Sequence, residues 1–158
     1  MTKILCLALI LISSGCSIMN ESQVPQSVLA TNNPAKVSKV STTGEPNNYT
    51  FAVTVSSPDT GCDRYADWWE VTTPDGELLY RRVLLHSHVD EQPFTRTGGT
   101  VVIQPQQEVI VRVHMNPDGY SPNAQKGTVK DGFWDSTLPN DFASSLASVE
   151  PLPKNCAF

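Results

Sequence analysis

The sequence has few charged residues, and few of those are basic. Charged residues make up 17% of the 158 residues, and 11 basic against 16 acidic side chains give a net charge of −5. A nucleic-acid-binding protein normally presents a basic face, and electrostatic binding to anionic lipid needs a polybasic cluster. Because the basic residues are also dispersed along the chain, the sequence predicts no nucleic-acid partner and no purely electrostatic membrane contact.

The sequence also lacks the local motifs of several enzyme classes. It contains no G-x-S-x-G, no P-loop and no H-E-x-x-H. A chain of this length, with 39% hydrophobic residues, suits one modest domain rather than a large enzyme with a deep cleft. A missing motif is weak evidence, because many active sites have no local signature. We therefore leave enzymatic activity open and favour a non-enzymatic protein.

The first fifteen residues have the features of a processing signal. Lys3 supplies a positive start, the stretch from Ile4 to Ile12 is apolar without a break, and residues 13–15 are small. The apolar run is too short to span a bilayer as a helix, so a signal peptide is the better interpretation.

A small residue directly before Cys16 resembles the lipobox of bacterial lipoproteins. In that family the cysteine thiol receives a diacylglyceryl group and becomes the new N-terminus. Ser13 departs from the family pattern, which usually has an apolar residue there. The alternative is an ordinary secretory peptide, cut near the same place and leaving Cys16 as a free thiol. By the family's sorting rule, Ser17 in place of Asp implies the outer membrane, with the domain facing the periplasm.

The remaining cysteines fit an exported protein. Cys6 leaves with the signal peptide and Cys16 takes the lipid, so Cys62 and Cys156 form an even pair. In an oxidising compartment such a pair predicts a disulfide, which would pin the C-terminal tail to the domain.

Four regions follow along the chain. We expect a signal peptide at 1–15, the lipidated cysteine and a flexible tether at 16–34, a β domain at 35–133 and a polar tail at 134–158. Within the tail, residues 141–147 are expected to form one short helix.

Short alternating segments in the third region predict an all-β fold. The expected strands lie at 37–40, 49–55, 65–72, 77–88, 101–103, 108–115 and 128–129. Thr73-Pro74-Asp75-Gly76 is a strong hairpin turn. About seven short strands without helical periodicity predict an antiparallel β-sandwich. The pattern resembles an immunoglobulin-like domain, with Trp68 or Trp69 as the aromatic of the third strand, although the usual cysteine pair between the sheets is absent.

The histidines suggest a candidate metal site. His86 and His88 are two residues apart, so on a strand both point to one face. In the immunoglobulin-like arrangement that strand and the strand carrying His114 flank the same middle strand, which carries Asp67. The four side chains would then meet at one edge as ligands for Zn or Cu. The alternative is that these histidines only hydrogen-bond neighbouring loops.

Three functional hypotheses result. The favoured one is an envelope binding or structural module, with an envelope protein or a glycan as partner and a surface formed by Arg82, Asp90, Glu91 and Arg112. The second is a periplasmic Zn- or Cu-binding protein. The third is an envelope hydrolase with Asp90 or Glu91 as acid or base, which would need a second carboxylate across a cleft.

Overall fold

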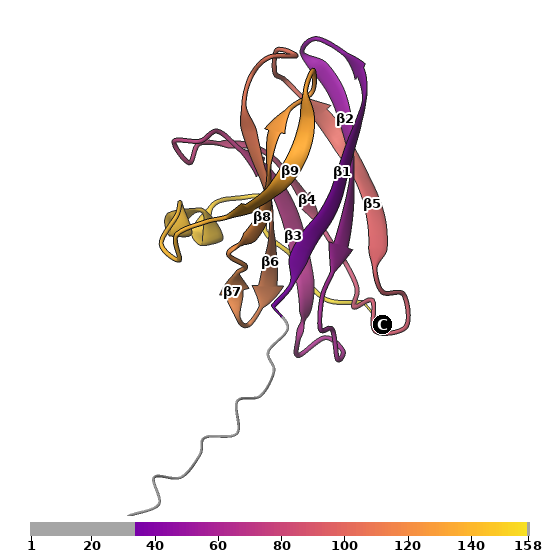
Figure 1. The fold of residues 1–158 in the computed structure, drawn as a ribbon. Coiled ribbons are helices and arrows are strands. Elements are labelled where there is room, and N and C mark those ends of the chain that lie inside the picture. Colours follow the sequence, from indigo (N-terminus) through magenta and orange to yellow (C-terminus); the bar gives the residue numbers. More distant parts are fainter. Residues whose placement is uncertain (1–33, 158) are drawn as a thin grey trace, which may run out of the picture. The chain divides into compact units, whose positions relative to one another are not determined.

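The structure, a computed structural model, describes residues 34–157, which form a β-sandwich (Figure 1). The predicted signal peptide, Cys16 and the tether up to residue 33 lie outside the described residues. The strands are β1 (Lys36–Glu45), β2 (Asn48–Ser56), β3 (Tyr65–Thr72), β4 (Leu78–Val83), β5 (Phe94–Val101), β6 (Val109–Asn116), β7 (Gly119–Tyr120), β8 (Asn123–Thr128) and β9 (Gly132–Thr137), followed by a short 3-10 helix, η1 (Ser144–Ser148).

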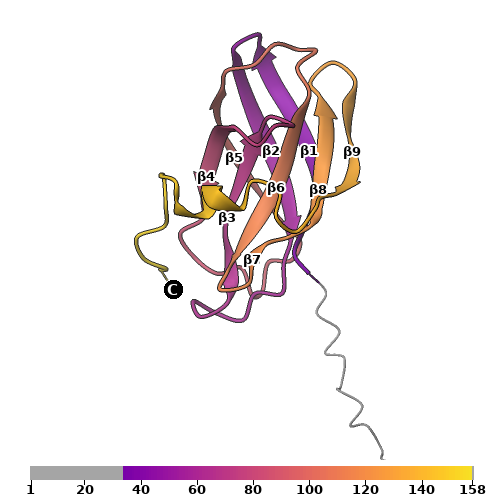
Figure 2. The same cartoon turned by 90° about the vertical axis from the view of Figure 1, so that its left-hand side faces the viewer.

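The strands pair in the order β4-β3-β6-β8-β1-β2-β5, with β7 added to β6 and β9 added to β8. Every pairing is antiparallel except a single contact between Lys36 of β1 and Asn123 of β8, which is parallel. The path folds back at that contact, so β1, β2 and β5 lie behind β4, β3, β6 and β8 (Figure 2). The predicted antiparallel all-β sandwich is confirmed, as is the position of β3 between β4 and β6.

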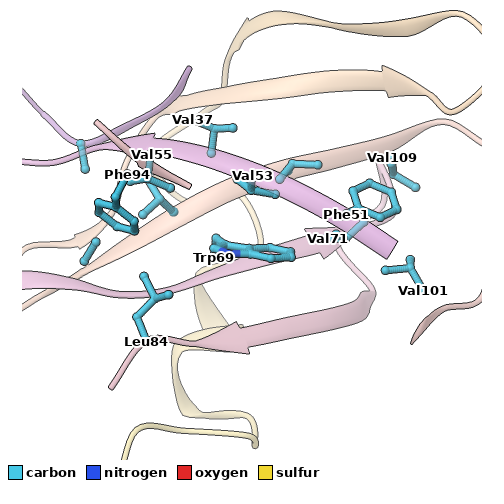
Figure 3. Close-up of a cluster of buried hydrophobic side chains, with 14 of the residues drawn as sticks. Val37, Phe51, Val53, Val55, Trp69, Val71, Leu84, Phe94, Val101 and Val109 are labelled. Atoms are coloured by element: carbon cyan, nitrogen blue, oxygen red, sulfur yellow. The ribbon is translucent and has the colours of Figure 1, made fainter. Parts of the chain in front are cut away.

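The core lies between the two layers and follows the alternation of the sequence. Phe51, Val53 and Val55 of β2 are fully buried, and Trp69 of β3 lies among them (Figure 3). Alternate residues of a strand point to opposite faces, so one face of each strand supplies the core. In β3, however, every residue is buried, which means that its outer face is covered as well.

Several strands differ from the expectation, and β5 and β4 differ at the edge where the two sheets meet. β5 runs from Phe94 through Gly98 and Gly99 to Val101, whereas the expected strand lay at 101–103. A Cβ on Gly98 would lie 2.5 Å from the hydroxyl oxygen of Tyr80, so this glycine allows a close approach of β4 rather than a turn. β4 ends at Val83, whereas the expected strand ran to His88.

The cover on the outer face is the C-terminal segment, residues 138–157 (Figure 2). β9 extends to Thr137, beyond the expected start of the tail at 134, and η1 replaces the helix expected at 141–147. Leu138 packs with Ile110 of β6 on that face. The predicted disulfide between Cys62 and Cys156 is present, with 5.6 Å between the Cα atoms, and it holds the end of the segment.

Candidate functional site

A buried charged triad lies on the outer face of β3, β4 and β6. The register places Glu70 opposite Arg81 of β4 and opposite Arg112 of β6. The side chain of Glu70 is fully buried, with Arg81 Nη2 at 2.6 Å from one carboxylate oxygen and Arg112 Nη2 at 2.7 Å from the other. Each oxygen therefore accepts from one guanidinium, which compensates the buried charges.

The same two guanidiniums bind the C-terminal segment. Arg81 donates to the carbonyl oxygen of Leu146 at 2.7 Å, and Arg112 donates to that of Ala143 at 3.0 Å. Their further acceptors are the carbonyl oxygens of Phe142, Val149 and Pro151. The triad is therefore a clamp that fastens the segment across the sheet. This corrects the assignment of Arg112 to a binding surface, since it is only 1% exposed.

Aromatic rings fill the space beside the clamp. The ring of His114 stacks on Trp68 with centroids 3.7 Å apart, and His114 Nδ1 lies 2.7 Å from Asp67 Oδ1. The Tyr120 hydroxyl donates to Glu70 at 3.3 Å. Burial, and next the charge of Glu70, raises the pKa of Tyr120 to about 12. Tyr120 therefore keeps its proton at neutral pH and remains a donor to the carboxylate.

A small pocket lies at the edge where β4 approaches β5. It has a volume of about 100 Å³, and its polar lining is Arg82 of β4, Arg96 of β5, and His86 and His88 of the intervening loop. Since these residues come from both sheets, the pocket exists only in the folded sandwich.

Hydrogen bonds hold the His88 loop in place. The backbone N–H of His88 donates to Asp59 Oδ2 at 2.8 Å, and the Gln92 amide donates to the His88 carbonyl oxygen at 3.0 Å. The His88 ring stacks on Phe94 of β5 with centroids 3.7 Å apart. The ring position is thus set by contacts on two sides.

Neither ring nitrogen of His88 has a hydrogen-bond partner within residues 34–157, although the side chain is buried. Its Nδ1 lies 3.8 Å from Asp59 Oδ2, which is too far for a hydrogen bond. Burial lowers the pKa of His88 to about 4, and the positive charge of Arg96 acts in the same direction. At neutral pH the imidazole is therefore uncharged, with one N–H donor and one acceptor nitrogen.

The lowered pKa of His88 predicts an acid-sensitive fold. Between about pH 6.5 and pH 4, His88 binds a proton in the unfolded chain but not in the folded protein. Acidification through this pH range therefore favours unfolding. The contribution of neutral His88 to the free energy of unfolding is fully present above about pH 6.5. It falls by as much as about 3 kcal/mol as the pH approaches 4. Urea unfolding of the wild type and of His88→Phe, which keeps a ring against Phe94, should show a smaller acid loss in the variant. An equal loss in both proteins would contradict this assignment.

The structure does not bring the four predicted metal ligands together. The rings of His86 and His88 lie 4.4 Å apart beside β5, whereas His114 pairs with Asp67 and stacks on Trp68. No group of three or more His, Cys, Asp or Glu residues in the described part of the chain could hold a metal ion. Because β4 ends at Val83, the loop carries its histidines toward the other sheet, which corrects the expected common edge.

Of the other candidate surface residues, Arg82 lies on β4 and lines the pocket, whereas Asp90 and Glu91 lie on the loop between β4 and β5. Arg82, Asp90 and Glu91 are exposed, as a binding surface requires. Glu91 pairs with Arg96 at 2.7 Å, and this hydrogen bond lowers the pKa of Glu91. A general acid at neutral pH needs a raised pKa, so the shift of Glu91 does not favour the role of acid in a hydrolase.

Fold and site together define a β-sandwich with a clamped C-terminal segment and an edge pocket lined by arginine, histidine and apolar side chains. No family model and no solved structure matches the chain. A protein of Halomicrobium mukohataei, named "Putative lipoprotein", is 42% identical over 82 residues, which are 52% of this chain and 40% of that protein. The chain thus spans less than half the length of this relative.

Proposed function

We propose that the chain is a cell-envelope lipoprotein, anchored by a lipid on Cys16, whose folded domain is a binding or structural module. The observation that carries the proposal is Cys16 directly after a small residue and an apolar run. A relative with lipoprotein in its name supports it. So does the disulfide between Cys62 and Cys156, because disulfides persist in oxidising compartments.

The finer location is part of the same proposal. Ser17 after the cysteine favours the outer membrane, with the domain facing the periplasm. Among the helices in residues 34–157, none has the length and apolar character needed to cross a bilayer.

The anchor is tested by Cys16→Ser. We expect the wild type to sediment with membranes after a high-salt wash and to carry a diacylglyceryl mass on its N-terminal residue. The variant should lose both properties, because the thiol is the site of lipid attachment. Cys6→Ser is the matched control, since that thiol leaves with the signal peptide. A mature wild type with a free Cys16 thiol would refute the anchor, and separation of inner and outer membranes tests the location.

For the binding role, the residues around the edge pocket are the best-supported surface. Arg82, Asp90 and Glu91 are exposed beside it, and the loop between them is held by Asp59 and Gln92. The partner proposed is an envelope protein or a glycan that presents a negatively charged group to the arginines.

A further inference from the structure

The buried imidazole of His88 needs a hydrogen-bond partner that is not supplied by residues 34–157. Buried polar atoms in folded proteins nearly always have one. His88 is 3% exposed, both of its ring nitrogens lack a partner among those residues, and it lines the edge pocket. A group that enters the pocket and accepts a hydrogen bond would satisfy the N–H donor of this imidazole.

The charge of the pocket indicates the sign of that group. The chain carries a net charge of −5, yet the lining contains two arginines and no carboxylate. Arg82 has no carboxylate partner in the described part of the chain. Within residues 34–157 the ion-pair partner of Arg96 is Glu91, whose side chain is 59% exposed. An exposed ion pair is worth little, so an anionic ligand can replace Glu91 at low cost.

The geometry of the lining residues indicates the class of ligand. A guanidinium is a planar fork of donors that matches the oxygens of a carboxylate or a phosphate. A neutral imidazole adds one N–H donor. The pocket volume of about 100 Å³ is small, so the pocket holds only a compact group. The positive charges of two arginines in the lining repel a cation, which argues against Zn or Cu at His86 and His88.

We propose that this pocket binds a compact oxyanion, a phosphate or carboxylate group, through Arg82, Arg96 and His88. The inference rests on the binding role proposed above but not on the lipid anchor. The hydrogen bonds from Asp59 and to Gln92 hold the loop in place before the ligand arrives, which lowers the cost of ordering on binding.

The NMR signals of the three histidines provide a direct test of anion binding in the pocket. Inorganic phosphate and acetate are titrated separately into the full chain in detergent, and the imidazole signals are followed by NMR. We expect saturable shifts of His86 and His88 with at least one of the two anions, and the tighter one identifies the ligand class. His114 is hydrogen-bonded to Asp67 outside the pocket, so its NMR signal should not shift. Chloride at the same ionic strength should cause no saturable shift.

Variants connect the shifts to the pocket. Arg82→Gln is expected to weaken binding at least tenfold, because it removes a charged donor. His88→Phe should weaken it as well while keeping the ring stack on Phe94. Arg64→Gln is the control, since Arg64 is an exposed arginine paired with Asp118 away from the pocket. The proposal is overturned if neither anion shifts His86 and His88, if Arg82→Gln binds like the wild type, or if stoichiometric Zn binds there instead. A negative titration leaves the lipid anchor, tested by fractionation, unaffected.

Discussion

Replacement of Glu70 by alanine is expected to lower the free energy of unfolding by about 3–5 kcal/mol. The carboxylate is fully buried between Arg81 and Arg112, and its removal leaves two buried guanidiniums without a shared anion. Urea unfolding followed by tryptophan fluorescence measures the change, since Trp68 lies beside the clamp and Trp69 lies in the core.

Glu108→Ala is the matched control for this experiment. Glu108 pairs with Lys126 at 2.9 Å, but both side chains are more than a third exposed. Such a pair contributes about 0–1 kcal/mol. If Glu70→Ala cost no more than Glu108→Ala, the triad would not be a buried clamp.

The arginines of the clamp have a second role besides balancing the charge of Glu70. A buried ion cluster replaced as a unit by apolar residues is often tolerated. Here Arg81 and Arg112 also donate to carbonyl oxygens of the C-terminal segment, so their replacement leaves those acceptors without partners. The buried ionic cluster thus serves to position the segment as well as to balance charge.

Removal of the disulfide by Cys62→Ser with Cys156→Ser is expected to cost about 4 kcal/mol. The bond closes a loop with a sequence separation of 94 residues, and long loops gain the most from closure in the chain-entropy account. The variant should nevertheless keep most of the C-terminal segment in place, because Arg81 and Arg112 hold it independently of the disulfide.

Hydrogen exchange and unfolding together test this expectation. The Ala157 N–H, which donates to the Leu85 carbonyl, should lose protection in the double variant, whereas the Val149 N–H should stay protected. Reductant should lower the unfolding midpoint of the wild type and leave the variant unchanged. Equal midpoints for the oxidised and reduced wild type would contradict the predicted contribution.

Local patterns in the sequence were enough to predict the central strands. In β2 and β6 the apolar residues recur every second position, and this period is a property of the strand itself. The turn at residues 73–76 was predicted for a similar reason, because Pro74 and Gly76 favour its backbone angles. The Gly76 N–H donates to the Thr73 carbonyl oxygen as such a turn requires.

β5 and β9 were not predicted because their residues do not carry a local signal. Gly98 suggests a break until the ring of Tyr80 is seen to occupy the space beside it. β9 contains Trp134, which is half exposed, and lacks an apolar alternation. Its place comes from pairing with β8, a tertiary contact.

For the candidate site, the sequence alone determined which residues lie close together along one segment. The tertiary structure decided which other segments those residues contact. The rings of His86 and His88 lie 4.4 Å apart, but in a loop and not on the strand that their spacing assumed. The pairing of the two cysteines followed from counting. The separation of His114 from them depended on where β4 ends. The burial of Glu70 depended on the C-terminal segment, whose polar sequence gives no sign that it covers a sheet. Spacing acts within a strand, whereas burial and charge compensation depend on segments distant in the chain, which only the fold brings together.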